Sequence, residues 1–244
     1  ISAFLILRAL LTGKEKYCLR LSEIRFDKRK AVGILQIGIP SAFQYSLFAF
    51  ANLFVQSSVN SFDHVLVEGN SAAANADPLV YDMMAAFYTA CSSFIAQNFG
   101  ARKKKRILQT YLICLFYSFI TSLVLGVGIY LARYPFLYLF TSDKAVVEAG
   151  ITRLSIMALS YSASAFMDAS IAASRGLGKT AVPTFVVVMG SCVFRIIWIY
   201  TIFAYFHTIQ SLYILYVFSW GITAIAENIY FFHVYRHTLT EKKE

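Results

Sequence analysis

Six ionisable side chains stand inside long apolar stretches of this sequence, where a charge is costly. They are Asp77, Asp82, Arg153, Asp168, Arg195 and Glu227. At bilayer depth each costs at least about 2.5–3.5 kcal/mol on insertion scales, so such residues are functional or paired. Two kinds of chemistry fit them: fixed ion pairs that join helices, or the binding and release of a cation or a proton in a water-filled cavity.

Polar amide side chains on the first long apolar stretch also indicate contacts between helices or a water-filled cavity. At 100° per residue, Gln44 and Asn52 lie on one side of a helix, with Gln56 close by. That side would face protein or a water-filled cavity. Hydrogen bonding between helices is an equally good explanation for Gln44 and Asn52, because such bonds are common in helix bundles.

The segment 65–98 carries the most polar side chains. As a helix it would hold Glu68, Ser71, Asn75 and Asp82 on one side, and Asn70 and Asp77 on an adjacent side. Pro78 leaves the carbonyl of Ala74 without its donor and kinks or breaks the helix. Broken helices at membrane depth line cavities, so we expect this helix to line a central cavity. The alternative is a folded outer loop at 65–77.

The composition places these side chains in a membrane. The 244-residue chain is 58% hydrophobic and 14% charged, with a mean hydropathy of +0.61, against about 45–50% apolar and about 25% charged in soluble domains. One soluble core could not bury that surplus, and 16% aromatic residues exclude a disordered chain. With roughly 20 apolar residues needed per span, at most about eight spans fit.

We predict an all-α integral membrane protein with a bundle of six transmembrane helices, because helices satisfy their backbone groups in lipid. Residues 1–11 are apolar but too short to cross, and we expect them to end a preceding transmembrane helix. Residues 12–30 form a basic loop, 31–234 the six-helix lobe and 235–244 a tail. The six spans are 31–59, 65–98, 107–131, 146–173, 181–204 and 210–234.

The basic residues are distributed unevenly between the two ends of these spans. The loop 12–30, the turns 99–106 and 174–180 and the tail hold 17 of the 22 Lys and Arg residues, and the opposite turns hold two. Cytoplasmic loops are enriched in Lys and Arg, so we expect these four segments to be cytoplasmic. The net charge of +9 then reports orientation rather than nucleic-acid binding.

Depth along the helices suggests which groups pair. At about 1.5 Å per residue from the cytoplasmic end, Asp168 and Glu227 lie about 10 Å into the membrane and Arg195 about 20 Å, with Asp82 nearer to that level. We expect a carboxylate, or backbone carbonyls of a neighbouring helix, to neutralise Arg195. Another buried carboxylate would then bind and release a proton.

Signatures of enzymes and metal sites are absent from the sequence. The string Ala173-Ser-Arg-Gly-Leu-Gly-Lys-Thr180 ends like a phosphate-binding loop, but Ala173 replaces its first glycine and no strand precedes it. The four cysteines form no C-x-x-C pair, and the H-E-x-x-H and G-x-S-x-G motifs are missing. We expect no enzymatic activity, no metal site and no cofactor.

Six short strings stand out by their order and spacing along the chain. They are Gly38-Ile-Pro-Ser-Ala-Phe-Gln44, the string that begins Asn52-Leu-Phe-Val-Gln, the string that begins Glu68-Gly-Asn-Ser, Ala96-Gln-Asn-Phe-Gly-Ala-Arg102, Arg175-Gly-Leu-Gly-Lys-Thr-Ala-Val-Pro183 and Arg195-Ile-Ile-Trp-Ile-Tyr200. Together they resemble the second half of the multidrug and toxic compound extrusion (MATE) transporters. The resemblance is greatest to the bacterial branch with Gln early in the seventh helix, and it extends from the loop 12–30 to the tail.

The resemblance implies a twelve-helix antiporter of two six-helix lobes around a central cavity, in the inner membrane of a bacterium. This chain would be the second lobe, and its partner the first lobe of the same polypeptide. Such proteins export cationic or amphipathic compounds in exchange for H⁺ or Na⁺ by alternating access. The Na⁺-coupled branch has an acid where Gln44 stands, and Asp168 lies too close to Arg175 to match its second acid. That cation site is therefore not carried over.

Two other functions compete with this one. A lipid-linked oligosaccharide flippase of the same superfamily would show a more basic central cavity for pyrophosphate, and the buried acids argue against it. A non-transporting scaffold or an intramembrane enzyme fits poorly with the broken polar helix and the missing motifs. The candidate cavity residues are Gln44, Asn52, Asn75, Asp77, Asp82, Asp168, Arg195 and Glu227.

Overall fold

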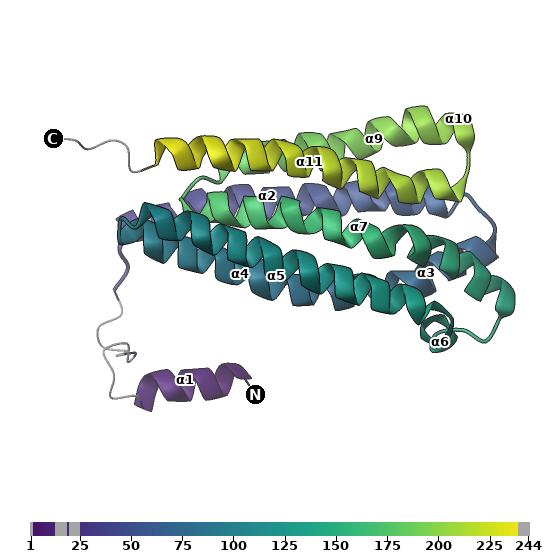
Figure 1. Ribbon diagram of the computed structural model, residues 1–244, viewed down its shortest axis with the longest axis horizontal. Coiled ribbons are helices and arrows are strands. Elements are labelled where there is room, and N and C mark those ends of the chain that lie inside the picture. The colour runs from purple at the N-terminus through teal and green to yellow at the C-terminus, as the bar shows by residue number, and fades with distance from the viewer. Residues whose placement is uncertain (1, 13–18, 20–24, 239–244) are drawn as a thin grey trace. The chain divides into compact units, whose positions relative to one another are not determined.

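The computed structural model describes residues 2–12, 19 and 25–238, and it divides the chain into two units, Ile1–Gly38 and Ile39–Glu244 (Figure 1). Most of the predicted basic loop and of the tail, at 13–18, 20–24 and 239–244, lies outside the described residues. In the first unit, the short apolar helix α1 covers Ser2–Thr12. The prediction that it ends a preceding transmembrane helix stays a prediction.

Helix α2, Lys28–Val59, begins in the first unit. The carboxylate of Asp27 accepts hydrogen bonds from the backbone N–H groups of Arg29 and Lys30, at 2.9 and 3.1 Å. These are donors that a helix start leaves without an intrahelical partner, so Asp27 stabilises the beginning of α2.

The second unit is helical along nearly all of its described length. Its helices α3 to α11 are His64–Ala74, Ala76–Gly100, Lys104–Leu131, Arg133–Tyr138, Lys144–Gly176, Ala181–Val187, Phe194–Trp198, Ala204–Phe206 and Ile209–His237. Two π-helical segments, η2 at Val188–Val193 and η3 at Ile199–Phe203, join α8, α9 and α10 into one continuous helix.

Six helices of the described chain are long and apolar enough to cross a membrane, which confirms the predicted all-α fold. They are Lys28–Val59, His64–Gly100, Lys104–Leu131, Lys144–Gly176, Ala181–Phe206 and Ile209–His237. Each agrees with a predicted span to within a few residues at either end.

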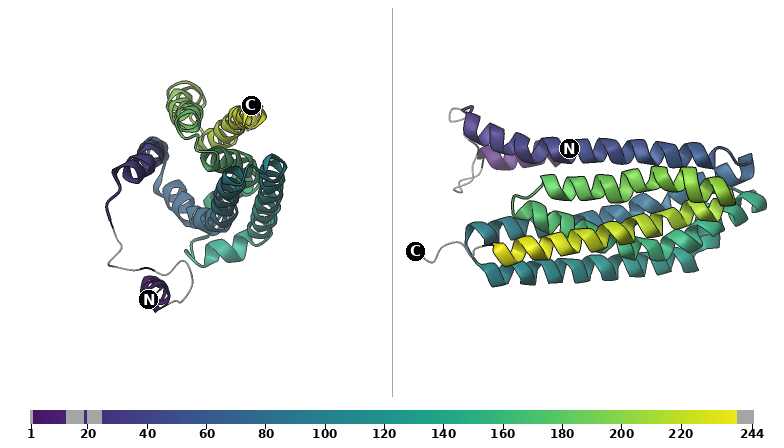
Figure 2. Two further views of the ribbon diagram at one scale, coloured as in Figure 1. Left: turned by 90° about the vertical axis from the view of Figure 1, so that its left-hand side faces the viewer. Right: turned by 90° about the horizontal axis from the view of Figure 1, so that it is seen from above.

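Helix α7 lies in the middle of the second unit, where it contacts α3, α4, α5 and α11 (Figure 2). Its buried face is built from small residues such as Gly150, Ala158 and Ala165. Small residues let helix backbones approach closely, which is how helices associate in lipid. The closest approach is at Gly126 of α5, where an added Cβ would lie 2.0 Å from the carbonyl oxygen of Ala158.

The polar second span is helical on both sides of a break at Asn75, between α3 and α4. Asp63 begins α3 by accepting a hydrogen bond from the N–H of Leu66 at 2.9 Å. Since residues 64–74 are helical, the alternative of a folded outer loop is wrong. Pro78 lies four residues beyond Ala74 and cannot donate to its carbonyl, which accounts for the break.

The three basic segments of the second unit lie at one end of its helices, on the left of Figure 1. The ammonium of Lys104, at the start of α5, donates to the carbonyl of Arg236 in the last turn of α11 at 2.9 Å. It also lies 5.3 Å from the ring centre of Tyr235. The turns 99–106 and 174–180 and the end of α11 therefore share one end of the bundle.

The close contact at Gly126 makes a testable prediction. The variant Gly126→Ala should lose about 1–3 kcal/mol of stability, because its methyl group would overlap the Ala158 carbonyl and force α5 and α7 apart. The control is Gly128→Ala, two residues along α5, where an added Cβ meets nothing within 4 Å. Thermal unfolding in detergent should show a lower Tm for the first variant only. Equal Tm values would contradict this packing.

Candidate functional site

Two cavities lie between α2 and the other helices of the second unit. The first, the Arg195 cavity, has a volume of about 280 Å³ and is lined by α2, α3, α4, α7, α9 and α11. The second, the Asp168 cavity, has a volume of about 190 Å³ and is lined by α2, α4, α7, α8 and α11. Each is named after an ionisable residue in its lining.

A half-buried ion pair fixes the wall of the Arg195 cavity at the break between α3 and α4. Nη2 of Arg153 lies 2.6 Å from Oδ2 of Asp77, and its Nη1 donates to Oδ1 of Asn70 at 2.9 Å. The hydroxyl of Tyr161 donates to the other carboxylate oxygen of Asp77. Both oxygens of Asp77 are therefore engaged, and the ion pair joins α4 to α7.

Arg195 is fully buried in the same cavity wall and contacts neutral groups. Its Nη1 donates to Oδ1 of Asn52 at 2.7 Å and its Nε to Oγ of Ser219 at 3.4 Å. The guanidinium carbon lies 4.7 Å from the ring centre of Phe48 and 4.5 Å from that of Tyr216. In the described part of the chain, no carboxylate or backbone carbonyl pairs with Arg195, so the prediction that such a group of these helices neutralises it is wrong.

The helix that carries Arg195 is irregular. Arg195 stands in the short α9, between the π-helical segments η2 and η3, and such segments occur frequently at functional sites. Gly190, in η2, allows close packing on α11, since an added Cβ would lie 2.5 Å from Oγ1 of Thr223. This irregular helix thus places the guanidinium of Arg195 inside the bundle.

The Asp168 cavity contains an acid and a base that do not pair with each other. Nη2 of Arg175 donates to Oε1 of Gln44 at 3.0 Å, which joins α7 to α2. Asp168 lines the cavity, and its carboxylate forms no hydrogen bond or ion pair with the residues that the structure describes. This carboxylate is available to a proton or another ligand.

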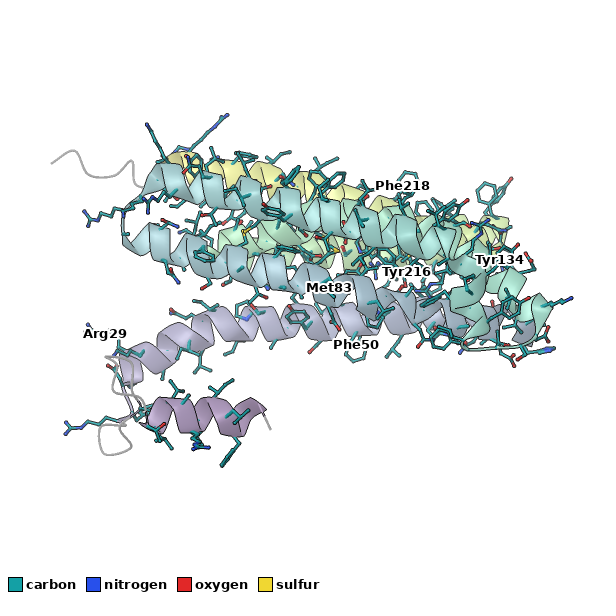
Figure 3. The ribbon with its side chains drawn as sticks, turned by 60° about the horizontal axis from the view of Figure 1, so that its bottom comes forward. Arg29, Phe50, Met83, Tyr134, Tyr216 and Phe218 are labelled. Carbon is teal, nitrogen blue, oxygen red and sulfur yellow. The ribbon has the colours of Figure 1, made fainter. Side chains whose placement is uncertain are left out.

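Three aromatic side chains, Phe48, Tyr81 and Trp220, line both cavities and so form a layer between them. The rings of Tyr81 and Trp220 meet edge to face with centres 6.0 Å apart. Sequence reasoning missed this layer, although the spacing of Tyr213, Tyr216 and Trp220 places them on one face of α11. Figure 3 shows Tyr216 and the outward-pointing Phe218 on different sides of that helix.

Three predicted cavity residues lie elsewhere. Asn75 is exposed and its side-chain amide donates to the carbonyls of Ser71 and Ala72, both at 3.1 Å. Asp82 is exposed on the same side of the helix, so the inner side of that span is the one with Asn70 and Asp77. Glu227 is fully buried on α11 and borders neither cavity, and neither of its carboxylate oxygens has a hydrogen-bond partner among the residues that the structure describes.

The other five candidates fall into two sets. Asn52, Asp77 and Arg195 line the Arg195 cavity, and Gln44 and Asp168 line the Asp168 cavity. Over residues 2–12, 19 and 25–238, no three His, Cys, Asp or Glu side chains are grouped so that they could hold a metal ion.

Comparison with known proteins identifies the family of the chain. The chain matches the family MatE over residues 40–201, and no curated protein sequence matches it. An outward-facing multidrug resistance MATE transporter of the MOP superfamily aligns with a TM-score of 0.87 and 19% identity, over 99% of this chain and 54% of that chain.

Two further structures align similarly. A MOP superfamily transporter from Pyrococcus furiosus, described by the reverse polarity of its binding pocket, gives a TM-score of 0.88 at 18% identity over 99% and 54% of the two chains. A mutant MATE transporter from Vibrio cholerae gives 0.76 at 19% identity over 97% and 52%. The chain thus spans about half the length of these proteins, and it belongs to the MATE family of membrane transporters.

Proposed function

We propose that this chain is one lobe of a secondary active antiporter that exports amphipathic compounds, cationic ones among them, in exchange for H⁺ or Na⁺. The observation that carries the proposal is the pair of cavities between α2 and the rest of the bundle, each with ionisable groups at membrane depth. Such groups mark substrate and ion pathways in membrane proteins. Alternating access would open these cavities to one side of the membrane at a time.

The other lobe of the transporter is part of the same proposal. The chain covers 54% of the length of its structural neighbours, and six helices supply one wall of a central cavity. We propose that the first lobe of the same polypeptide supplies the other wall, in the inner membrane of a bacterium. The end that carries 99–106 and 174–180 would face the cytoplasm, because basic loops remain on that side.

Asp168 is the acid in this lobe that best fits ion coupling. Asp77 is held by Arg153 and Tyr161, whereas the carboxylate of Asp168 lines a cavity and has no bonded partner among the residues described. A carboxylate that is not bound to a neighbour can take up and release a proton or a sodium ion during each cycle.

A lipid-linked oligosaccharide flippase of the same superfamily remains the second candidate. The observation that favours it is the presence of two guanidinium groups, Arg153 and Arg195, in one cavity lining. A cavity for pyrophosphate is expected to be basic, because Arg binds phosphate oxygens in bidentate fashion. The free carboxylate of Asp168 favours the antiporter.

Dye efflux tests the antiporter directly. The complete polypeptide that contains this chain, reconstituted in vesicles, should expel an amphipathic fluorescent dye when a pH or a Na⁺ gradient is imposed, and not when both gradients are absent. The gradient that drives efflux identifies the coupling ion. Correctly inserted protein that moves no dye under either gradient would rule out the antiporter.

Two acid-to-amide variants should behave differently in that assay. Asp168→Asn should fold normally and lose gradient-driven efflux by at least about tenfold, because the amide cannot be deprotonated at the coupling step. Asp77→Asn should lower the Tm, because Arg153 would lose its counter-ion; a fully buried pair would cost about 3–5 kcal/mol and this half-buried one less. Asp82→Asn, exposed on α4, is the control. Normal coupled efflux by Asp168→Asn would remove Asp168 from the coupling role.

A further inference from the structure

The polar atoms of the Arg195 cavity that lack a partner are hydrogen-bond donors. Nη2 of Arg195, Nε of Arg153 and the hydroxyl of Tyr213 are buried, and none has a hydrogen-bond partner among the described residues. All three residues line the cavity. A guanidinium can only donate, and a phenol both donates and accepts. The unused capacity of this cavity therefore selects a ligand that accepts hydrogen bonds.

The buried and half-buried acceptors around the two guanidinium groups are already in use. The carboxylate of Asp77 accepts from Arg153 and Tyr161. The side-chain oxygen of Asn70 accepts from Arg153, and that of Asn52 accepts from Arg195. Near the guanidinium groups, the unused hydrogen-bonding capacity is therefore mainly that of donors.

The charges of the lining also favour a ligand that accepts hydrogen bonds. Two guanidinium groups, Arg153 and Arg195, face one carboxylate, Asp77, and that carboxylate is paired with Arg153. The positive charge of Arg195 is fully buried and has no ion-pair partner in the described part of the chain. A buried charge is stabilised when an opposite charge joins it, so an anion would be favoured here and a simple cation repelled.

The remaining contacts restrict how such a ligand can reach Arg195. The rings of Phe48 and Tyr216 contact the guanidinium, while Asn52 and Ser219 occupy Nη1 and Nε. Nη2, which has no partner among the described residues, and the second N–H of Nη1 are left for a ligand. The apolar part of the lining, from Val55, Val59, Met157 and Trp220, provides a surface for a hydrocarbon chain.

We propose that the Arg195 cavity binds the carboxylate or phosphate group of an amphipathic anion. Nη2 of Arg195 and the hydroxyl of Tyr213 donate to the acidic group, and the hydrocarbon part lies against the apolar lining. This assigns amphiphiles with an acidic head to the Arg195 cavity, as one class among the substrates of the proposed antiporter, and as a transport statement it rests on that function. The binding itself does not, since it requires no gradient.

Equilibrium binding to the 244-residue chain in phosphatidylcholine nanodiscs tests the proposal. The probes are radiolabelled octanoate and octyltrimethylammonium, which have the same chain length and opposite charge. Octanoate should bind saturably, at least about tenfold more tightly than the cation. Equal or tighter binding of the cation, or no saturable octanoate binding, would overturn the proposal. An efflux failure with intact octanoate binding would count against the antiporter alone.

Two substitutions locate the site. Tyr213→Phe removes a hydroxyl that has no hydrogen-bond partner among the described residues, so the fold is kept, and octanoate should bind about fivefold more weakly. Arg195→Gln should weaken binding at least about tenfold. The matched controls, Tyr200→Phe at an exposed residue and Arg133→Gln at a half-buried one, lie outside both cavities and should bind as the parent does. If Arg195→Gln does not fold, Tyr213→Phe alone tests whether octanoate binds in the Arg195 cavity. Unchanged octanoate binding by Tyr213→Phe would then contradict the proposed site.

Replacing phosphatidylcholine by phosphatidylglycerol distinguishes the two sources of an acidic head. The anionic surface of phosphatidylglycerol repels octanoate from every variant alike, so the loss of affinity in the parent chain is compared with the loss in Arg195→Gln. If an anionic lipid head occupies the cavity, the loss is larger in the parent chain than in Arg195→Gln. If the natural ligand is a free amphiphile, the two losses are equal.

Discussion

A guanidinium that is buried without a counter-ion among the described residues is the constraint around which this lobe is organised. Arg195 can stay charged inside the bundle only because Asn52 and Ser219 accept its hydrogen bonds and Phe48 and Tyr216 contact its planar group. These four partners come from two helices, α2 and α11. The charge therefore connects α2 to the bundle across a cavity, and the irregular helix around α9 places it there.

The two cavities differ in which of their polar groups have no hydrogen-bond partner among the described residues. Among the described residues, the carboxylate of Asp77 in the Arg195 cavity is engaged and buried donors are unused. In the Asp168 cavity, Nη2 of Arg175 donates to Gln44 while its Nε has no partner, and the carboxylate of Asp168 lines the cavity without a hydrogen bond from the described part of the chain. A layer of aromatic rings, among them Tyr81 and Trp220, separates them. In the proposed transport cycle, one cavity of this lobe would hold an acidic substrate group and the other would carry the coupling ion.

Much of this architecture could be predicted from the sequence. Apolar length alone located six spans, and Pro78 located the break in the second one, because both follow from local chemistry. Helical periodicity separated the side that carries Asn75 and Asp82 from the side that carries Asp77. It could not tell which of these sides faces inward, since that depends on packing against α7.

The partners of Arg195 lay beyond sequence reasoning for a related reason. Depth along a straight helix suggests that Arg195 pairs with a carboxylate at a similar level. It does not predict that Oδ1 of Asn52 lies 2.7 Å from Nη1 of Arg195, or that π-helical segments stand on both sides of α9. The aromatic layer was missed because Phe48, Tyr81 and Trp220 come from three separate helices. Glu227 was expected in a cavity, yet its buried carboxylate borders neither of the two.

The most direct test of the central claim is an experimental structure of the chain with bound 8-bromooctanoate, in which anomalous scattering locates the bromine. The account predicts the bromine within the Arg195 cavity and the carboxylate within hydrogen-bond distance of Nη2 of Arg195 and the hydroxyl of Tyr213. A carboxylate bound at the basic turn 99–106, with only water in the cavity, would contradict it.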